Sequence, residues 1–208
     1  MNVPLTPLRC LERALDLFAN KTGLVCGDLS FTYAEFGTRC HRLASALGKH
    51  GIEPGDRVAY LSFNTHKLLE GYYGVVQAGA IVMPLNVRLS PLEFITILNH
   101  SGAKMVLFEN DFLTLVDQLQ PECPEVRLWV TLDSAVPQAA FTYEELLSEG
   151  TPHAPDILRV DENAVAELFY TSGSTGTPKG AMLTHRNLYL SALAVTGTVD
   201  DPANTIDL

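Results

Sequence analysis

Apolar residues recur along the chain with two different spacings, and each spacing predicts a type of element. Residues 8–18 repeat apolar side chains every three or four positions, which predicts an amphipathic helix. Short, almost continuously apolar runs predict strands that are covered on both faces of a sheet. These runs lie at residues 57–63, 80–85, 104–108 and 126–132, and two later runs predict a strand at 165–171 and a short strand at 181–184.

Helix start signals lie before and between these runs. Thr32 and Glu35 form a capping-box pattern, which predicts a helix to about Lys49. The same Phe-Thr-Tyr-x-Glu pattern recurs at residues 141–145 as a second local cap, while residues 24–33 predict two short strands around a Gly-Asp turn. Further helices are predicted from Asn64 to about Ala78, from Ser90 with Glu93 to about His100, over residues 111–119, and from Thr184 to about Ala194.

This alternation of strands and helices predicts an α/β fold with a mostly parallel sheet and crossover helices. A polar stretch with Pro152 and Pro155 is interpreted as a surface connection within the same domain. Residues 205–208 resemble the start of a strand that nothing completes. We therefore expect the chain to be the first part of a larger domain.

Composition narrows the function classes. The 208 residues are 47% apolar and carry a formal net charge of -10, and no basic block appears, which argues against nucleic-acid binding. No apolar run approaches the roughly 20 residues that span a bilayer, so a cytoplasmic protein is expected. The four cysteines form no CxxC pair and are interpreted as reduced thiols; they are Cys10, Cys26, Cys40 and Cys123.

Two other kinds of site find little support. The six histidines show no metal-ligand spacing, and most are expected at the surface or at helix caps. His185 follows the predicted Thr184 cap, which favours a structural role over a catalytic one. Ser172 has no acid–base partner at a recognisable spacing and the GxSxG pattern is absent, so a hydrolase triad has no support.

The segment YTSGSTGTPKG at residues 170–180 is the strongest candidate for chemistry. One interpretation is an ordinary surface turn, because Gly and Ser are common in turns. The other is a phosphate-binding nest, in which backbone amides, hydroxyl groups and one lysine converge on an anion. Glycine would let the backbone approach the anion closely, and Lys179 would supply a point charge.

Charge distribution favours the second interpretation. From Leu168 to Val199 the chain contains no Asp or Glu, although it has 24 such residues in all. Carboxylates would repel an anion through a site of low dielectric constant. The segment is not a Walker A motif, because Pro178 precedes Lys179 and Gly180 follows it.

Residues 169–188, FYTSGSTGTPKGAMLTHRNL, resemble the phosphate-binding signature of the adenylate-forming superfamily, which includes the acyl-CoA synthetases. Ser174 stands where that signature often has Thr. The runs LSFTYAEF, GIEPGDRVAY, QAGAIVMPLNVRLSPLEF and SGAKMVLF resemble the N-terminal part of the same proteins, in order. The similarity is greatest to fatty-acyl and related acyl-CoA ligases.

The resemblance implies a large N-terminal adenylation domain that uses ATP, Mg²⁺ and coenzyme A. The implied substrate is a carboxylic acid, and a fatty acid is the expected type. Its carboxylate would attack the α-phosphorus of ATP to give an acyl-adenylate, and coenzyme A would then take the acyl group. The implied phosphate-binding residues are Thr171, Ser172, Gly173, Ser174, Thr175, Gly176, Thr177, Pro178 and Lys179.

The resemblance covers only the first part of the superfamily's domain. The adenine-binding segment, the acidic magnesium ligand, the ribose-binding aspartate and the catalytic lysine of the C-terminal lid domain would all lie beyond Leu208. We therefore expect residues 1–208 to contain neither a catalytic residue nor a metal ligand, and to be inactive alone. The alternatives are a non-enzymatic polyphosphate-binding fragment or an interaction fragment, and a homo-oligomer is compatible with each.

Overall fold

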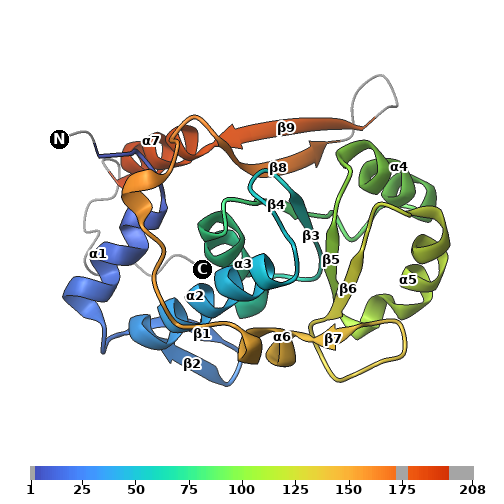
Figure 1. Ribbon diagram of the computed structural model, residues 1–208, viewed down its shortest axis with the longest axis horizontal. Helices are drawn as coiled ribbons and strands as arrows, with labels where there is room; N and C mark the ends of the chain where they lie inside the picture. Colours follow the sequence, from blue (N-terminus) through green and yellow to red (C-terminus); the bar gives the residue numbers. More distant parts are fainter. Residues whose placement is uncertain (1–2, 172–177, 197–208) are drawn as a thin grey trace.

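The computed structural model describes residues 3–171 and 178–196 as an α/β fold around a seven-stranded sheet (Figure 1). The strand order is β7-β6-β5-β3-β4-β8-β9, and each neighbouring pair is parallel except β8 and β9. The expectation of a mostly parallel sheet is therefore confirmed. The strands are β3 (Arg57–Leu61), β4 (Ile81–Pro84), β5 (Met105–Phe108), β6 (Leu128–Thr131), β7 (Phe141–Thr142), β8 (Val165–Thr171) and β9 (Lys179–Thr184).

Helices cover both faces of this sheet, and the alternation of side chains along the strands decides which face each residue joins. On β3, Val58 and Tyr60 join the core beneath α2 (Tyr33–Lys49), α3 (His66–Gln77) and α6 (Tyr143–Glu149). Ala59 and Leu61 join the core beneath α4 (Pro91–Ser101) and α5 (Leu113–Leu119). Figure 1 shows α2 and α3 on one side of the central strands and α4 and α5 on the other.

A smaller cluster holds the N-terminal elements against α2. It contains Leu11 of α1 (Leu8–Phe18) with Phe36 and Cys40 of α2, and the hairpin of β1 (Thr22–Cys26) and β2 (Leu29–Thr32) packs on it. The remaining described elements are α7 (His185–Thr196) and three short 3₁₀ helices, η1 (Asn110–Phe112), η2 (Gln120–Glu122) and η3 (Ile157–Arg159).

The local cap predictions are largely confirmed. Reciprocal capping boxes begin α2 at Thr32, α4 at Ser90 and α6 at Thr142. Gly102 ends α4 with φ 63°, in the left-handed conformation that glycine adopts without a steric cost. One cap was predicted wrongly: α3 begins after Thr65 and not after Asn64, and the Thr65 side chain makes no capping hydrogen bond.

Three further predictions need correction or lie outside the described residues. His41 and His66 are buried, although most of the histidines were expected at the surface or at helix caps. β9 begins at Lys179 and so includes the lysine that was assigned to the loop. The predicted strand at residues 205–208 lies outside the described residues. Within residues 3–171 and 178–196, no helix has the length and apolar character to cross a bilayer.

Candidate functional site

The β8–β9 hairpin brings together the two ends of the Gly- and Ser-rich segment. Thr171, the last residue of β8, pairs with Lys179, the first residue of β9, and both are exposed. Pro178 precedes Lys179 and is half-buried. The hairpin lies along the top of Figure 1. The remaining predicted site residues lie outside the described part of the chain; they are Ser172, Gly173, Ser174, Thr175, Gly176 and Thr177.

Tyr170 anchors this end of the hairpin to the rest of the fold. Its hydroxyl lies 2.6 Å from Nδ1 of His100 at the end of α4, and the two rings meet edge to face. Gly180 lies opposite Tyr170 on β9, and a Cβ at this position would lie 3.0 Å from the Leu168 side chain and 3.3 Å from the Tyr170 ring. Glycine therefore leaves room for the tyrosine ring that fixes the segment before Thr171.

Burial changes the pKa of two groups on β8, Glu167 and Tyr170. The last carboxylate before the acid-free stretch is Glu167, which is half-buried, and burial raises its pKa to about 7. A carboxyl group with this pKa carries less negative charge at neutral pH than an exposed glutamate. Burial also raises the pKa of the Tyr170 phenol, and the positive charge of Arg57 opposes this rise. Lys179 supplies a cation at the first position of β9, opposite Thr171.

His185 has a structural role in the described residues, as its position after the Thr184 cap suggested. Its Nδ1 lies 2.9 Å from the Thr6 hydroxyl, and its backbone amide donates to the carbonyl of Ala164. Burial lowers the pKa of the imidazole, which keeps the ring neutral at pH 7. Thr184 and Asn187 exchange hydrogen bonds and begin α7 (His185–Thr196).

Sequence reasoning missed two features of this region. The Tyr170–His100 contact joins positions 70 residues apart, and no local pattern announces it. The raised pKa of Glu167 arises from packing against the fold, whereas in the sequence Glu167 is simply a polar residue in an apolar run. Within the described residues, no three His, Cys, Asp or Glu side chains lie together in a group that could hold a metal ion.

Comparisons with known proteins show which family the whole chain resembles. A family model described as "AMP-binding enzyme" matches residues 11–205. Over 190 residues the chain is 40% identical to a long-chain-fatty-acid–CoA ligase of Thermus thermophilus, with 89% of this chain and 34% of the relative covered. It is 36% identical over 202 residues to 4-hydroxybutyrate–CoA ligase 2 of Metallosphaera sedula, with 91% of this chain and 36% of the relative covered.

A solved structure shows the same fold. The inhibitor-bound N-terminal domain of FACL13 from Mycobacterium tuberculosis superposes with a TM-score of 0.85 at 26% identity, covering 96% of this chain and 49% of that chain. By comparison, the chain spans about a third of the length of the two curated ligases described above.

Proposed function

Because the chain belongs to the AMP-binding enzyme family, we propose that the protein it forms is an ATP-dependent acid–thiol ligase of the acyl-CoA synthetase type. The observation that carries the proposal is the pairing of Thr171 with Lys179 at the two ends of the Gly- and Ser-rich segment. Both curated relatives described above are CoA ligases, which supports coenzyme A as the thiol.

The proposed reaction has two steps. A carboxylate oxygen attacks the α-phosphorus of ATP, the bond from that phosphorus to the bridging oxygen breaks, and pyrophosphate leaves. The thiol of coenzyme A then attacks the acyl carbon of the adenylate, and AMP leaves with the bonding electrons. A carboxylate is a poor acyl donor, and adenylation gives it a good leaving group. The substrate is a carboxylic acid, and a fatty acid is the first to test.

The described residues fit a polyphosphate at the hairpin tip. Lys179 is an exposed cation, and Thr171 opposite it offers a hydroxyl donor. We assign phosphate binding to residues 171–179 as a unit, with Lys179 as the charge that offsets the β- and γ-phosphates. Mg²⁺ would supply further neutralisation when it is bound with the nucleotide.

We also propose that residues 1–208 form the N-terminal portion of the adenylation domain and bind phosphate without completing the reaction. The short share of each relative that the chain spans supports this assignment. All four cysteines are free thiols, which suits a reducing cytoplasm.

Carboxylate-dependent exchange of labelled pyrophosphate into ATP tests the first step. The assay uses a protein that contains this chain and has the full length of the relatives. It should catalyse the pyrophosphate exchange, and Lys179→Ala should reduce the rate. Lys21→Ala removes the same charge from an exposed site on another part of the surface and is the matched control. Exchange that survives Lys179→Ala unchanged would refute the assigned role of the lysine. A protein without any carboxylate-dependent exchange would refute the proposed activity.

A further inference from the structure

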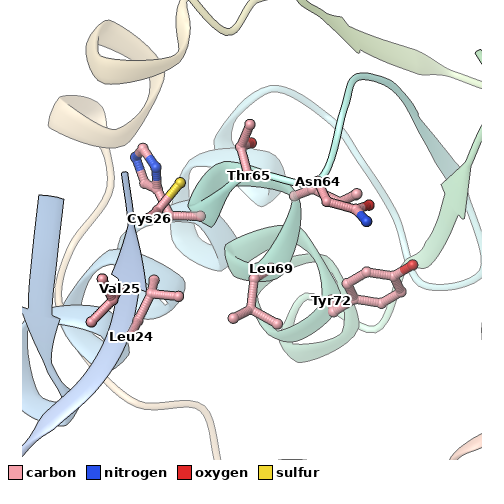
Figure 2. A pocket seen from close by; sticks show the side chains of 9 residues that line it. Leu24, Val25, Cys26, Asn64, Thr65, Leu69 and Tyr72 are labelled. Carbon is pink, nitrogen blue, oxygen red and sulfur yellow. The ribbon is translucent and has the colours of Figure 1, made fainter. Parts of the chain in front are cut away.

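Cys26 is a free thiol at the end of β1, and it is one of the residues that line a cavity of about 280 Å³ (Figure 2). The cavity lies between β1 and the first turns of α3. Its wall is largely apolar and is formed by Leu24, Val25, Leu68, Leu69 and Tyr72. This volume is at the lower end of the range for ligand pockets, so the cavity suits a small molecule.

The four cysteines of the chain differ in their surroundings. Cys40 and Cys123 belong to the buried core clusters, where a reagent cannot reach them in the folded chain. Cys10 is exposed on α1. Cys26 is half-buried and lines the cavity, so a small molecule that enters the cavity lies next to its thiol. Cys10 therefore serves as an internal reference for a thiol without such an environment.

The start of α3 adds polar groups without partners to the same cavity. The side chains of Thr65 and His66 line it, and Thr65 does not cap the helix. Thr65 Oγ1 and His66 Nδ1 are both buried and have no hydrogen-bond partner in the described residues. His66 as a whole is only 8% exposed. Buried polar atoms without partners cost free energy, so a ligand that hydrogen-bonds to them is favoured.

Charged groups of both signs lie near this end of the cavity. An adjoining cavity shares Cys26, Thr65 and His66 with the first one. The charged residues that line the adjoining cavity are Lys67, Glu109, Asp111 and Asp133. Burial, followed by the positive charges of Arg39 and Lys67, lowers the pKa of His66, so its ring is neutral at pH 7. A ligand of either sign would meet a like charge here, which favours an uncharged ligand.

We propose that Cys26 is a modification site for a small, uncharged, apolar α,β-unsaturated carbonyl compound that the cavity between β1 and α3 holds. The hydrocarbon part of the compound lies against the apolar wall, and its carbonyl oxygen accepts a hydrogen bond from the Thr65 hydroxyl. The thiol, the apolar wall and the unpartnered hydroxyl thus each match one part of such a compound. This assignment does not depend on the proposed ligase activity.

The proposed reaction is an addition in which no group leaves. The Cys26 thiol gives its proton to solvent, and the thiolate is the nucleophile. The sulfur forms a bond to the β-carbon, and the electrons of the carbon–carbon double bond move toward the carbonyl oxygen. The resulting enolate takes up a proton at the α-carbon, so the product is a thioether and no oxidant is needed. The Thr65 hydroxyl donates to the oxygen on which negative charge develops.

Competition between Cys26 and Cys10 for two maleimides tests the proposal. N-cyclohexylmaleimide and N-(2-hydroxyethyl)maleimide are both uncharged and share the reactive unsaturated carbonyl group, but only the first has a large apolar part. Limited labelling of the wild-type chain, followed by peptide mass spectrometry, gives the ratio of Cys26 to Cys10 labelling for each reagent. This ratio should be about tenfold higher for the cyclohexyl reagent, because the cavity buries its apolar ring. Equal ratios for the two reagents would overturn the proposal.

A pair of leucine variants tests the wall of the cavity. Leu69→Gln makes the wall more polar, while Leu92→Gln makes the same change at an exposed position on α4. The first should remove the preference of Cys26 for the cyclohexyl reagent, and the second should leave it unchanged. A preference that survives Leu69→Gln would refute the cavity as the binding site.

A pair of threonine variants tests the hydrogen bond to the carbonyl oxygen. Thr65→Val removes the hydroxyl and should slow the labelling of Cys26 by both reagents about tenfold relative to Cys10. Thr65→Ser keeps the hydroxyl and should retain the wild-type rate. Labelling of Cys26 at the wild-type rate in Thr65→Val would contradict the assigned role of Thr65. If Thr65→Val does not fold, the reagent pair and the leucine pair still decide the proposal.

Discussion

Replacing Arg39 with Met should remove the partner of a buried carboxylate and strongly destabilise the fold. Glu70 is fully buried, and its two oxygens accept from Arg39 Nε at 2.6 Å and from the Tyr143 hydroxyl at 2.8 Å. Methionine keeps much of the apolar stem of arginine but leaves the carboxylate with a single donor. Breaking a buried ion pair from one side costs about 3–5 kcal/mol, whereas the exposed contact of Arg39 with Glu144 adds at most about 1 kcal/mol.

The loss should depend on pH in a defined direction. Burial raises the pKa of Glu70 above its ordinary value, and Arg39 opposes this effect. A raised pKa in the folded state means that stability falls as pH rises from the unfolded to the folded value. Removing Arg39 raises this pKa further. The variant should therefore lose least at low pH, and the loss should grow by up to about 1.4 kcal/mol per pH unit until Glu70 ionises.

Urea unfolding at pH 5.0 and pH 7.5 measures both effects. Arg13→Met, at an exposed position on α1, is the control for the loss of one positive charge. Glu70→Gln in the Arg39→Met background removes the stranded charge and should recover part of the stability. A loss that is the same at both pH values, or that matches the loss in Arg13→Met, would refute the assignment of a buried ion pair.

Three further predictions concern packing, the candidate site and thiol chemistry. Gly150→Ala should lower the free energy of unfolding by about 1–3 kcal/mol because its Cβ would lie 1.9 Å from a backbone carbonyl oxygen. Gly48→Ala, with open space around its Cβ, should be neutral or stabilising, and an unchanged free energy of unfolding for Gly150→Ala would contradict this. Tyr170→Phe should cost about 1 kcal/mol in the same assay and weaken pyrophosphate binding, and an unchanged affinity would argue against the anchoring role. A disulfide reagent should label exposed Cys10 quickly and spare Cys40, whose pKa is raised by burial, until the chain unfolds; rapid labelling of Cys40 in the native state would be inconsistent with this packing.

Local signals predicted much of the fold. The box residues Thr32 and Glu35 lie three positions apart, so the sequence alone contains both partners of each capping hydrogen bond. The nearly continuous apolar runs correctly predicted the buried parallel strands β3, β4, β5 and β6. The run at 181–184 correctly predicted a strand, but β9 pairs antiparallel with β8 and is mostly exposed. The two-residue strand Phe141–Thr142 was recognised only as a cap, because so short a strand is defined by its partner β6 and not by its own pattern.

Contacts between distant parts of the chain could not be predicted. His66 becomes buried because the β1–β2 hairpin covers it, and its ring lies 5.2 Å from that of Phe31, 35 residues away in the sequence. Arg39 meets Glu70 and Glu144 through the packing of α2 against α3 and α6. The same holds for the candidate site. The residue types of 171–179 suggest phosphate binding from the sequence alone, but the contact of Tyr170 with His100 depends on the tertiary fold.

The affinity of the chain for magnesium pyrophosphate tests the central claim most directly. NMR titration of wild type, Lys179→Ala and the Lys21→Ala control would give both the affinity and the residues that respond. We predict shifts at the amides of Tyr170, Thr171, Lys179 and Gly180, with an affinity loss of about 1–3 kcal/mol in Lys179→Ala and none in Lys21→Ala. Shifts that map away from the β8–β9 hairpin, or an affinity that Lys179→Ala leaves unchanged, would contradict the assignment of this hairpin as a phosphate site.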